Sequence, residues 1–212
     1  PKKHTWGAVL LSKFPIINST HHLLPSPHGE LAPAIHAVLD IWGVPTHVVV
    51  SHNGQFEDKL DRELQTKAIA RILSDAYPHP AIFLGYVVTK PHAPRPEPYD
   101  ILFSDGLIFD VDPDDKDRWC QYLGFRGLER VGYARVSRYT VTDTELQTFK
   151  LAVPDRLEPN RDVRPFRVSG RHFKPAAWTY PLSLVRPGVR LNETHKYSPY
   201  IYPQYFEFEA RH

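Results

Sequence analysis

The stretch from residue 35 to residue 85 constrains the fold most, because its hydrophobic period changes twice. Apolar and polar residues alternate over 35–41, and a β-branched run follows over 46–50, a pattern typical of two neighbouring strands joined at Gly43. Apolar residues then recur every four positions, which predicts an amphipathic helix over 57–73. Residues 81–85 return to a buried strand. The order strand, strand, helix, strand predicts an α/β (α+β) fold.

The flanking segments are less regular. A compact apolar run lies at 8–11, residues 131–142 are β-rich, and 148–153 are expected to close the sheet. The prolines of 91–98 predict an extended loop. Residues 154–212 carry eight of the 21 prolines of the chain and many aromatic residues. We therefore expect one domain over 1–153 and an irregular aromatic and proline-rich extension over 154–212, packed on the same domain.

Composition excludes several classes of protein. The chain has 212 residues with 26 basic and 24 acidic side chains, so no overall positive field marks a nucleic-acid binder. Cys120 is the single cysteine, which excludes an internal disulfide and a cysteine-based zinc site. No apolar run approaches the length of a membrane span. The sequons that begin at Asn18 and Asn192 favour a lumenal location.

His52 and a group of arginines are candidate site residues. His52 follows the apolar strand before the helix, where it acts as a general acid or base, or as a turn histidine bonded to the backbone. The arginines 126, 130, 135 and 138 alternate with aromatic residues, Tyr133 among them. Guanidinium groups bind phosphate oxygens in a fork geometry, which favours a phosphate-bearing ligand. The alternative is a solvated, salt-bridged strand face.

Carboxylates and further histidines allow two kinds of interpretation. Asp143 and Glu145 point the same way on an extended chain, which gives an acid/base pair or a pair of metal ligands. The same residues also fit a helix cap. The acidic run 110–117 lacks the glycine and the final glutamate of a calcium loop, so a solvated turn is expected. The pair His21 and His22 lies in a segment interpreted as a proline-rich loop.

Four landmarks in order resemble the endonuclease/exonuclease/phosphatase superfamily. Residues 7–16 are similar to the family strand "G-x-A-I-L-S-R-Y-P-I", and 49–53 with Arg62 and Gln65 are similar to "N-T-H-L … R-x-x-Q". Further along, 83–88 stand in the place of "L-G-D-F-N", 118–123 resemble "R-I-D-Y-I", and 141–144 stand where the family has "S-D-H". The resemblance implies the C-terminal portion of a DNase-I-like four-layer α/β/β/α sandwich.

The departures from these motifs concern the metal site. Tyr86, Val88, Gln121 and Thr144 occupy the places of the family's aspartate, asparagine, second aspartate and histidine. Metal-dependent hydrolysis by the nuclease route is therefore not expected, and no metal ligand is assigned. A divalent metal stays open as a cofactor, although the usual ligand positions are altered. His52 and Asp143 are the family-type polar residues that this sequence keeps.

Residues 52–65 and 126–147 are most similar to one branch of the superfamily, the C-terminal lumenal domains of fungal proteins that remodel GPI anchors with ceramide. This resemblance implies a phospholipase C-like or lipid-exchange step on phosphatidylinositol or GPI lipids in the endoplasmic reticulum lumen, in a soluble domain of a membrane protein. The alternative is an inactive module that binds the inositol glycan. We assign catalysis to His52, Asp143 and Arg126, and substrate binding to Asn53, Tyr133, Arg135, Arg138 and Glu145.

The resemblance also predicts partners. The first strands of the family domain precede the landmark at 7–16, so we expect the N-terminal part of the domain as a separate chain or segment. We also expect a phosphatidylinositol or GPI lipid as a partner, and a membrane surface that the domain reaches through a tethered membrane region. Nucleic acid is not an expected partner.

Overall fold

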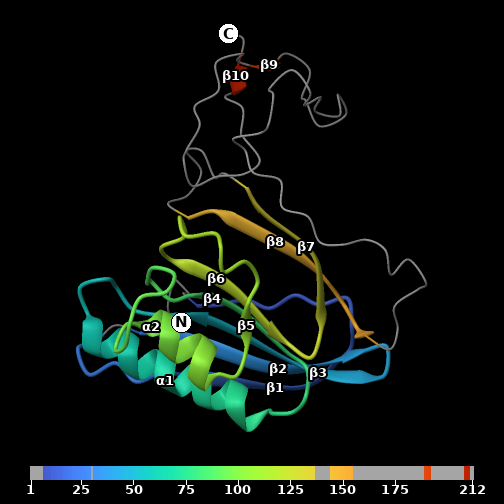
Figure 1. Ribbon diagram of the computed structural model, residues 1–212, viewed down its shortest axis with the longest axis horizontal. Helices are drawn as coiled ribbons and strands as arrows, with labels where there is room; N and C mark the ends of the chain where they lie inside the picture. Colours follow the sequence, from blue (N-terminus) through green and yellow to red (C-terminus); the bar gives the residue numbers. More distant parts are fainter. Residues whose placement is uncertain (1–6, 30, 137–143, 155–188, 192–207, 211–212) are drawn as a thin grey trace, which may run out of the picture. The chain divides into compact units, whose positions relative to one another are not determined.

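The computed structural model describes residues 7–29, 31–136, 144–154, 189–191 and 208–210 (Figure 1). The chain divides into two compact units. The first comprises Pro1–Glu129 and Leu151–Glu158, and the second comprises Arg130–Lys150 and Pro159–His212. Most of the extension predicted over 154–212 lies outside the described residues.

A six-stranded mixed sheet forms the first unit, in the order β1-β2-β3-β4-β6-β5. The neighbouring strands are antiparallel except for β3 and β4, which are parallel and therefore require the crossover helix α1 between them. The strands are β1 (Ile16–Leu23), β2 (Pro33–Ile41), β3 (Val44–His52), β4 (Ala81–Tyr86), β5 (Phe109–Asp110) and β6 (Gln121–Arg126), and α1 spans Lys59–Asp75.

The predicted hairpin is confirmed, and its turn follows from backbone conformation. Ile41 pairs with Val44, so Trp42 and Gly43 alone make the connection. Both residues have positive φ, 54° and 86°, as a two-residue turn between right-twisted strands requires. The Gly43 N–H also donates to Asp40 Oδ1 at 2.6 Å.

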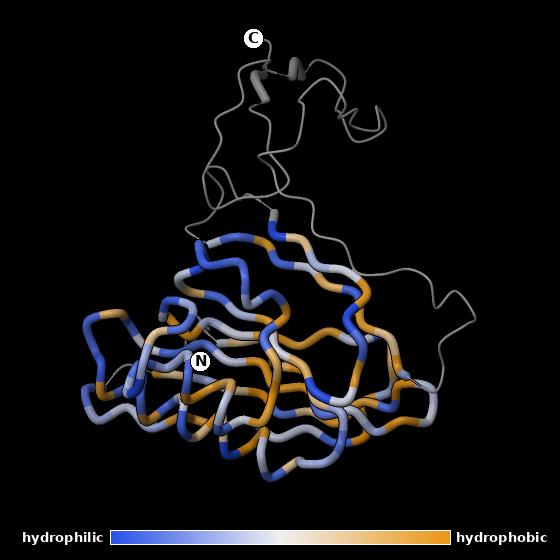
Figure 2. The backbone as a smooth tube through the Cα atoms, in the orientation of Figure 1, coloured by the Kyte–Doolittle hydropathy of each residue, from blue (hydrophilic) through white to orange (hydrophobic). Residues whose placement is uncertain are grey.

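One face of the sheet is covered by helices. Val49 and Phe83 of the central strands are fully buried against Ile69 and Leu73 of α1. The short helices α2 (Pro98–Asp100) and η1 (Ile101–Asp105) extend this cover, and η1 contacts α1. Hydrophobic stretches, orange in Figure 2, run through the central strands. The predicted helix over 57–73 and strand over 81–85 are thus confirmed within two residues.

The opposite face has a smaller core, made by Ala37, Leu39 and Val48. Leu10 and Phe14 pack against it, although residues 8–11 have no regular structure. Those residues find apolar contacts but no neighbouring strand to pair with. The family strand that the resemblance implies over 7–16 is therefore not formed there, and β1 begins only at Ile16.

The edge strand β1 was predicted as a loop. His21 and His22 pair with Ile35 and Ala34 of β2. Most side chains of β1 are exposed, because an edge strand packs on one neighbour only. A strand whose side chains need no burial carries no apolar alternation, so the sequence pattern did not reveal it.

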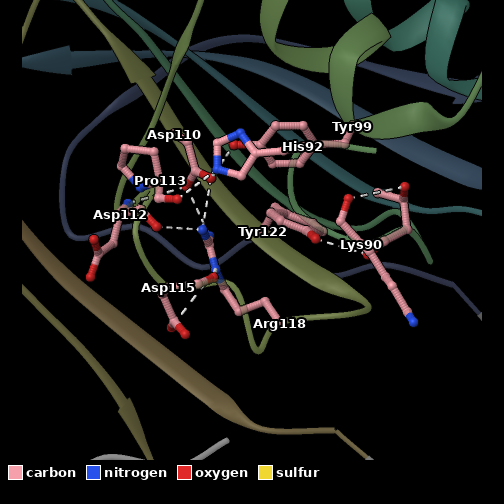
Figure 3. Close-up of polar contacts among 10 residues, drawn as sticks. Lys90, His92, Tyr99, Asp110, Asp112, Pro113, Asp115, Arg118 and Tyr122 are labelled. Carbon is pink, nitrogen blue, oxygen red and sulfur yellow. Dashed lines mark hydrogen bonds and ion pairs between the residues drawn. The ribbon is translucent and has the colours of Figure 1, made fainter. Parts of the chain in front are cut away.

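Part of the acidic run 110–117 lies around Arg118 and not in solvent: Asp110, Asp112 and Asp115 are buried or half-buried there (Figure 3). Asp114 and Asp117 are exposed, as expected for a solvated turn. The Arg118 Nη1 and Nη2 donate to the two Asp110 carboxylate oxygens at 2.8 and 2.7 Å. The Asp110 and Arg118 side chains are only 4% and 1% exposed. Tyr99 Oη donates to Asp110 at 2.8 Å, and burial together with that charge raises the Tyr99 pKa. Arg118 also bonds to carbonyls of Asp112 and Asp115, which wraps the run around it.

Replacing Arg118 with leucine is expected to lower the free energy of unfolding by about 3–5 kcal/mol, because it leaves the Asp110 carboxylate buried without its cation. Arg95→Leu is the matched control: Arg95 pairs with Asp100 and Asp105, but its side chain is 50% exposed. The control should leave the urea midpoint nearly unchanged. Equal losses in the two variants would contradict a structural role for the buried pair.

A row of histidines crosses the helix-covered face at the end where β3 begins. The His36 and His47 ring nitrogens lie 2.8 Å apart, and the His47 ring stacks on His79 at 5.6 Å. Burial and the neighbouring His22 lower the pKa of His36. Burial, the two neighbouring histidines and Arg126 lower the pKa of His47. The folded chain therefore favours the neutral rings.

Stability is expected to fall as the pH drops below about 6.5, because the unfolded chain then binds protons that His36 and His47 resist in the fold. Thermal unfolding between pH 8 and pH 5 measures this effect. A His47→Gln variant should show a smaller loss of melting temperature across the range, whereas His21→Gln, on the exposed edge strand, should behave like the parent. An unchanged slope for His47→Gln would refute the assignment.

The second unit contains two small sheets. β7 (Glu129–Val136) pairs with β8 (Leu146–Ala152), and β9 (Val189–Leu191) pairs antiparallel with β10 (Phe208–Ala210). The β-rich segments predicted over 131–142 and 148–153 are strands where they are described, although residues 137–142 lie outside the described part. β8 joins β7 and not the six-stranded sheet.

Candidate active site

His52 lies in a row of paired residues at one edge of the six-stranded sheet. It pairs with Tyr86 at the end of β4, and Tyr86 pairs with Gln121 at the start of β6. We call this boundary, where β3 and β4 end and β6 begins, the His52 edge. Side chains alternate along a strand, and Val49 faces α1, so His52 points to the opposite face.

The His52 ring stacks on Tyr86. The two ring centroids are 4.7 Å apart and the planes differ by only 4°. A stack engages the face of the imidazole, whereas proton transfer uses the nitrogens in the ring plane. Tyr86 therefore orients His52 without removing its acid–base chemistry. The sequence could not show this contact, because it depends on the register between β3 and β4.

The turn that follows Tyr86 is held from several sides. The N–H groups of Val87 and Val88 both donate to the Cys120 carbonyl, at 2.8 and 3.1 Å. Arg62 Nη1 donates to the Val88 carbonyl at 2.5 Å, and Tyr122 Oη donates to the Thr89 carbonyl at 2.8 Å. Each anchor comes from a buried side chain or a strand end, so the turn is fixed.

Val88 adopts a conformation that its side chain disfavours. Its φ is 53°, in the left-handed region that asparagine tolerates and β-branched residues avoid. In the superfamily motif "L-G-D-F-N", the position that Val88 occupies is an asparagine. The backbone of the turn thus has the shape suited to the polar residue, while the side chain that would ligate is gone.

Polar residues on the buried side of α1 fix the loop after His52. Gln65 Oε1 accepts the Gly54 N–H at 2.7 Å, and its Nε2 donates to Ser26 Oγ at 2.9 Å. Asn53 Nδ2 donates to Thr66 Oγ1 at 3.0 Å. The Asn53 N–H donates to the Tyr86 carbonyl at 2.8 Å, which continues the β3–β4 ladder beyond His52.

The charged residues Asp61 and Arg62 complete this polar layer. Asp61 is fully buried and its two carboxylate oxygens both accept the His28 N–H at 3.3 Å. Arg62 pairs with Glu97 at 3.3 Å, and its guanidinium carbon lies 5.1 Å from the Phe56 ring centroid. Arg62 and Gln65 belong to the sequence motif, whereas Asp61 and Thr66 were not predicted. The sequence did not mark them, because Leu60, one of the apolar residues that recur every four positions, is 47% exposed. The buried side of the helix runs instead through Thr66, Ile69 and Leu73.

Asn53 has a positioning role in this arrangement. Its side chain is 1% exposed and holds Thr66, although the sequence predicted it as a substrate-binding residue. The Asn53 Oδ1 atom is buried and has no hydrogen-bond partner among the described residues, so the substrate-binding role of Asn53 stays a prediction.

Arg126 does not lie at the His52 edge, in contrast to the prediction. It pairs with Ala81, at the far end of β4, about 17 Å along the strand from Tyr86. Its guanidinium donates to the carbonyls of Leu73, His79 and Gly106. Arg126 ties α1 to the start of β4, and it cannot serve as a cation beside His52 while it does so.

Of the remaining predicted residues, the described part of the second unit contains Tyr133, Arg135 and Glu145. Arg135 pairs with Glu145 at 3.0 Å, and their side chains are only 3% and 10% exposed. Tyr133 is half-buried in β7. Asp143 and Arg138 lie outside the described residues, so the predicted pairing of His52 with Asp143 stays a prediction.

The residues at the motif positions do not fit the family's divalent metal. Val88 has no ligating atom, and the neutral Tyr86 and Gln121 replace carboxylates that a hard cation prefers. Within the described ranges, no group of three histidine, cysteine or acidic side chains is placed to hold a metal ion.

Comparison with known families decides the relationship. The family model described as PGAP2IP, C-terminal nuclease-like domain, matches residues 1–173. The chain belongs to this family. The protein cwh43 of Schizosaccharomyces pombe is 56% identical over 189 residues, which are 89% of this chain and 18% of that protein. The chain thus spans less than a fifth of the curated relative, and no described helix is long and apolar enough to cross a membrane.

Solved structures confirm the fold expected for this PGAP2IP-type domain. An endonuclease/exonuclease/phosphatase from Bacteroides vulgatus has a TM-score of 0.53, with 12% identity over 66% of this chain and 67% of that chain. A family protein from Leptotrichia buccalis has a TM-score of 0.51, with 13% identity over 65% of this chain and 62% of that chain. The DNase-I-like fold is therefore established.

Gln65→Ala is expected to lower the free energy of unfolding by about 1–3 kcal/mol, because the buried Gly54 N–H loses its acceptor. Urea denaturation measures the change. Lys67→Ala, two residues along the same helix, removes a side chain that is 52% exposed and should cost within about 0.5 kcal/mol. A loss for Gln65→Ala no larger than that of the control would contradict the positioning role.

Proposed function

We propose that this domain carries out a phospholipase C-like or lipid-exchange step on the inositol phosphodiester of phosphatidylinositol or GPI-anchor lipids. The observation that supports it best is the oriented His52 at the sheet edge, beside motif positions that have lost their metal ligands. Membership in the PGAP2IP family and the similarity to cwh43 are consistent with this proposal. The endoplasmic reticulum lumen is the proposed compartment.

The chemistry suits a site without a metal-bound water. The inositol 2-hydroxyl attacks the adjacent phosphorus, and the bond from phosphorus to the diacylglycerol oxygen breaks. His52 takes the hydroxyl proton, and a general acid returns a proton to the departing diacylglycerol oxygen. The products are a cyclic inositol phosphate and diacylglycerol, and no water is consumed. Asp143 is the proposed acid.

The phosphate charge still needs a cation. Arg126 is held at the far end of β4, so it is not placed to bind the phosphate beside His52. The remaining arginine candidate is Arg138, which lies outside the described residues. Arg135 already pairs with Glu145 and would have to exchange that partner for phosphate.

A second candidate function is an inactive module that binds the inositol glycan for a membrane-embedded enzyme. The observation that favours it is Val88, which keeps the turn conformation of a ligating asparagine without its side chain. Binding of phosphatidylinositol without turnover under any metal condition would select this alternative.

His52→Ala is expected to lower diacylglycerol release from phosphatidylinositol by about a hundredfold or more, since a general base contributes at least that much. The assay compares the variant with the parent on vesicles that contain phosphatidylinositol. His21→Ala removes an exposed histidine of the edge strand β1 and should retain the parental rate.

The proposal fails if His52→Ala releases diacylglycerol at the parental rate. Circular dichroism melting of both variants separates loss of the proton-transfer group from loss of the fold. Detection of the cyclic phosphate by phosphorus NMR then distinguishes internal attack from hydrolysis.

A further inference from the structure

Exposed apolar side chains gather at the His52 edge. We define the apolar rim as Leu31, Phe56, Leu60 and Trp119, whose exposed fractions are 61%, 55%, 47% and 47%. Each comes from a different segment: the loop between β1 and β2, the loop between β3 and α1, the first turn of α1, and the loop before β6. In Figure 1 the first two loops lie together beside the start of α1.

Contacts between these segments fix the rim around the edge. The His28 N–H binds Asp61, which ties the β1–β2 loop to the helix turn that carries Leu60. Phe56 lies against the Arg62 guanidinium, and Arg62 binds the Val88 carbonyl.

Cys120 extends the same chain of contacts, since its carbonyl accepts the Val88 N–H, and Trp119 precedes it directly. The rim is therefore built on the same hydrogen bonds that hold the turns around His52.

We propose that the apolar rim inserts into the surface of a lipid bilayer and brings His52 to the level of the lipid phosphates. The inference rests on the proposed function, because the scissile phosphodiester of a membrane lipid lies just outside the apolar chains. Separate tryptophan, phenylalanine and leucine side chains on neighbouring loops suit the interface between head groups and acyl chains.

The charges beside the apolar rim indicate how it binds a lipid bilayer. Glu57, Asp58 and Lys59 lie between Phe56 and Leu60, so this stretch carries no excess positive charge. A rim without excess positive charge gains little from anionic lipid, so apolar insertion dominates and binding depends weakly on salt.

The opposite end of the sheet offers a matched control. Trp42 in the β2–β3 turn is 61% exposed, and Leu107, which follows η1, is 47% exposed. The Leu107 carbonyl accepts from Arg126, which places it at the far end of β4 from His52. Leu31→Ser/Trp119→Ser and Trp42→Ser/Leu107→Ser thus each remove one leucine and one tryptophan, one of them 61% and the other 47% exposed, from the two ends.

Flotation of the full chain with phosphatidylcholine vesicles containing phosphatidylinositol tests the inference. The rim double variant should reduce the bound fraction about tenfold at low and at moderate salt, and the control should bind like the parent. Trp119→Phe keeps an apolar ring and should retain binding, which guards against a folding defect. Equal binding of all variants, or equal losses in the two double variants, would overturn the proposal. So would a parent chain that is dimeric and a rim variant that is monomeric, because the rim would then be a dimer interface.

Turnover separates this inference from the proposed function. With a short-chain, monomeric phosphatidylinositol, the rim variant should match the parent, whereas its turnover on vesicles should fall with its binding. A parent that turns over neither substrate would end the proposed function, and the flotation result would still decide the rim. Loss of activity on the monomeric substrate in the rim variant would contradict a docking role.

Discussion

The buried polar side of α1 is the constraint on which the site depends. Helix residues that face a sheet are normally apolar, yet the first turns of α1 place Asp61, Arg62 and Gln65 there. Burying such groups is unfavourable unless their hydrogen bonds are made, and the backbone of the surrounding loops makes them. The second half of α1 is apolar and supplies the core through Ile69 and Leu73. One helix thus stabilises the sheet with one half and shapes its edge with the other.

This division explains how a family position can lose its chemistry without losing its shape. Arg62 and the Cys120 carbonyl hold the turn at Val88, so its left-handed backbone persists with a valine in place. Tyr86 has become a stacking partner for His52. The edge is therefore an ordered scaffold with altered side chains, and the proposed reaction, which uses an internal hydroxyl instead of a metal-bound water, starts from this arrangement.

Sequence patterns predicted the elements whose burial is periodic. The β2–β3 hairpin, α1 and β4 were found because each alternates or repeats against the core. β1 was missed because an edge strand exposes both its faces, and the run from Asp110 was read as solvated because its partner, Arg118, is brought in by a turn. Buried ion pairs have the composition of a surface, and only three-dimensional structure separates the two.

The same limits apply to the site. The position of His52 at a strand end followed from the sequence, whereas its stack on Tyr86 depends on strand register. Arg126 ends β6 and bonds to backbone carbonyls, whereas Arg135 lies in β7 and pairs with Glu145. The sequence shows that these arginines are close along the chain but not which partner each one takes. Titration of the chain with water-soluble glycerophosphoinositol, followed by NMR of the histidine ring signals, tests the central claim most directly. A ligand site at His52 should give saturable shifts of the His52 signal and none at His21; shifts elsewhere that spare His52 would contradict the proposed site.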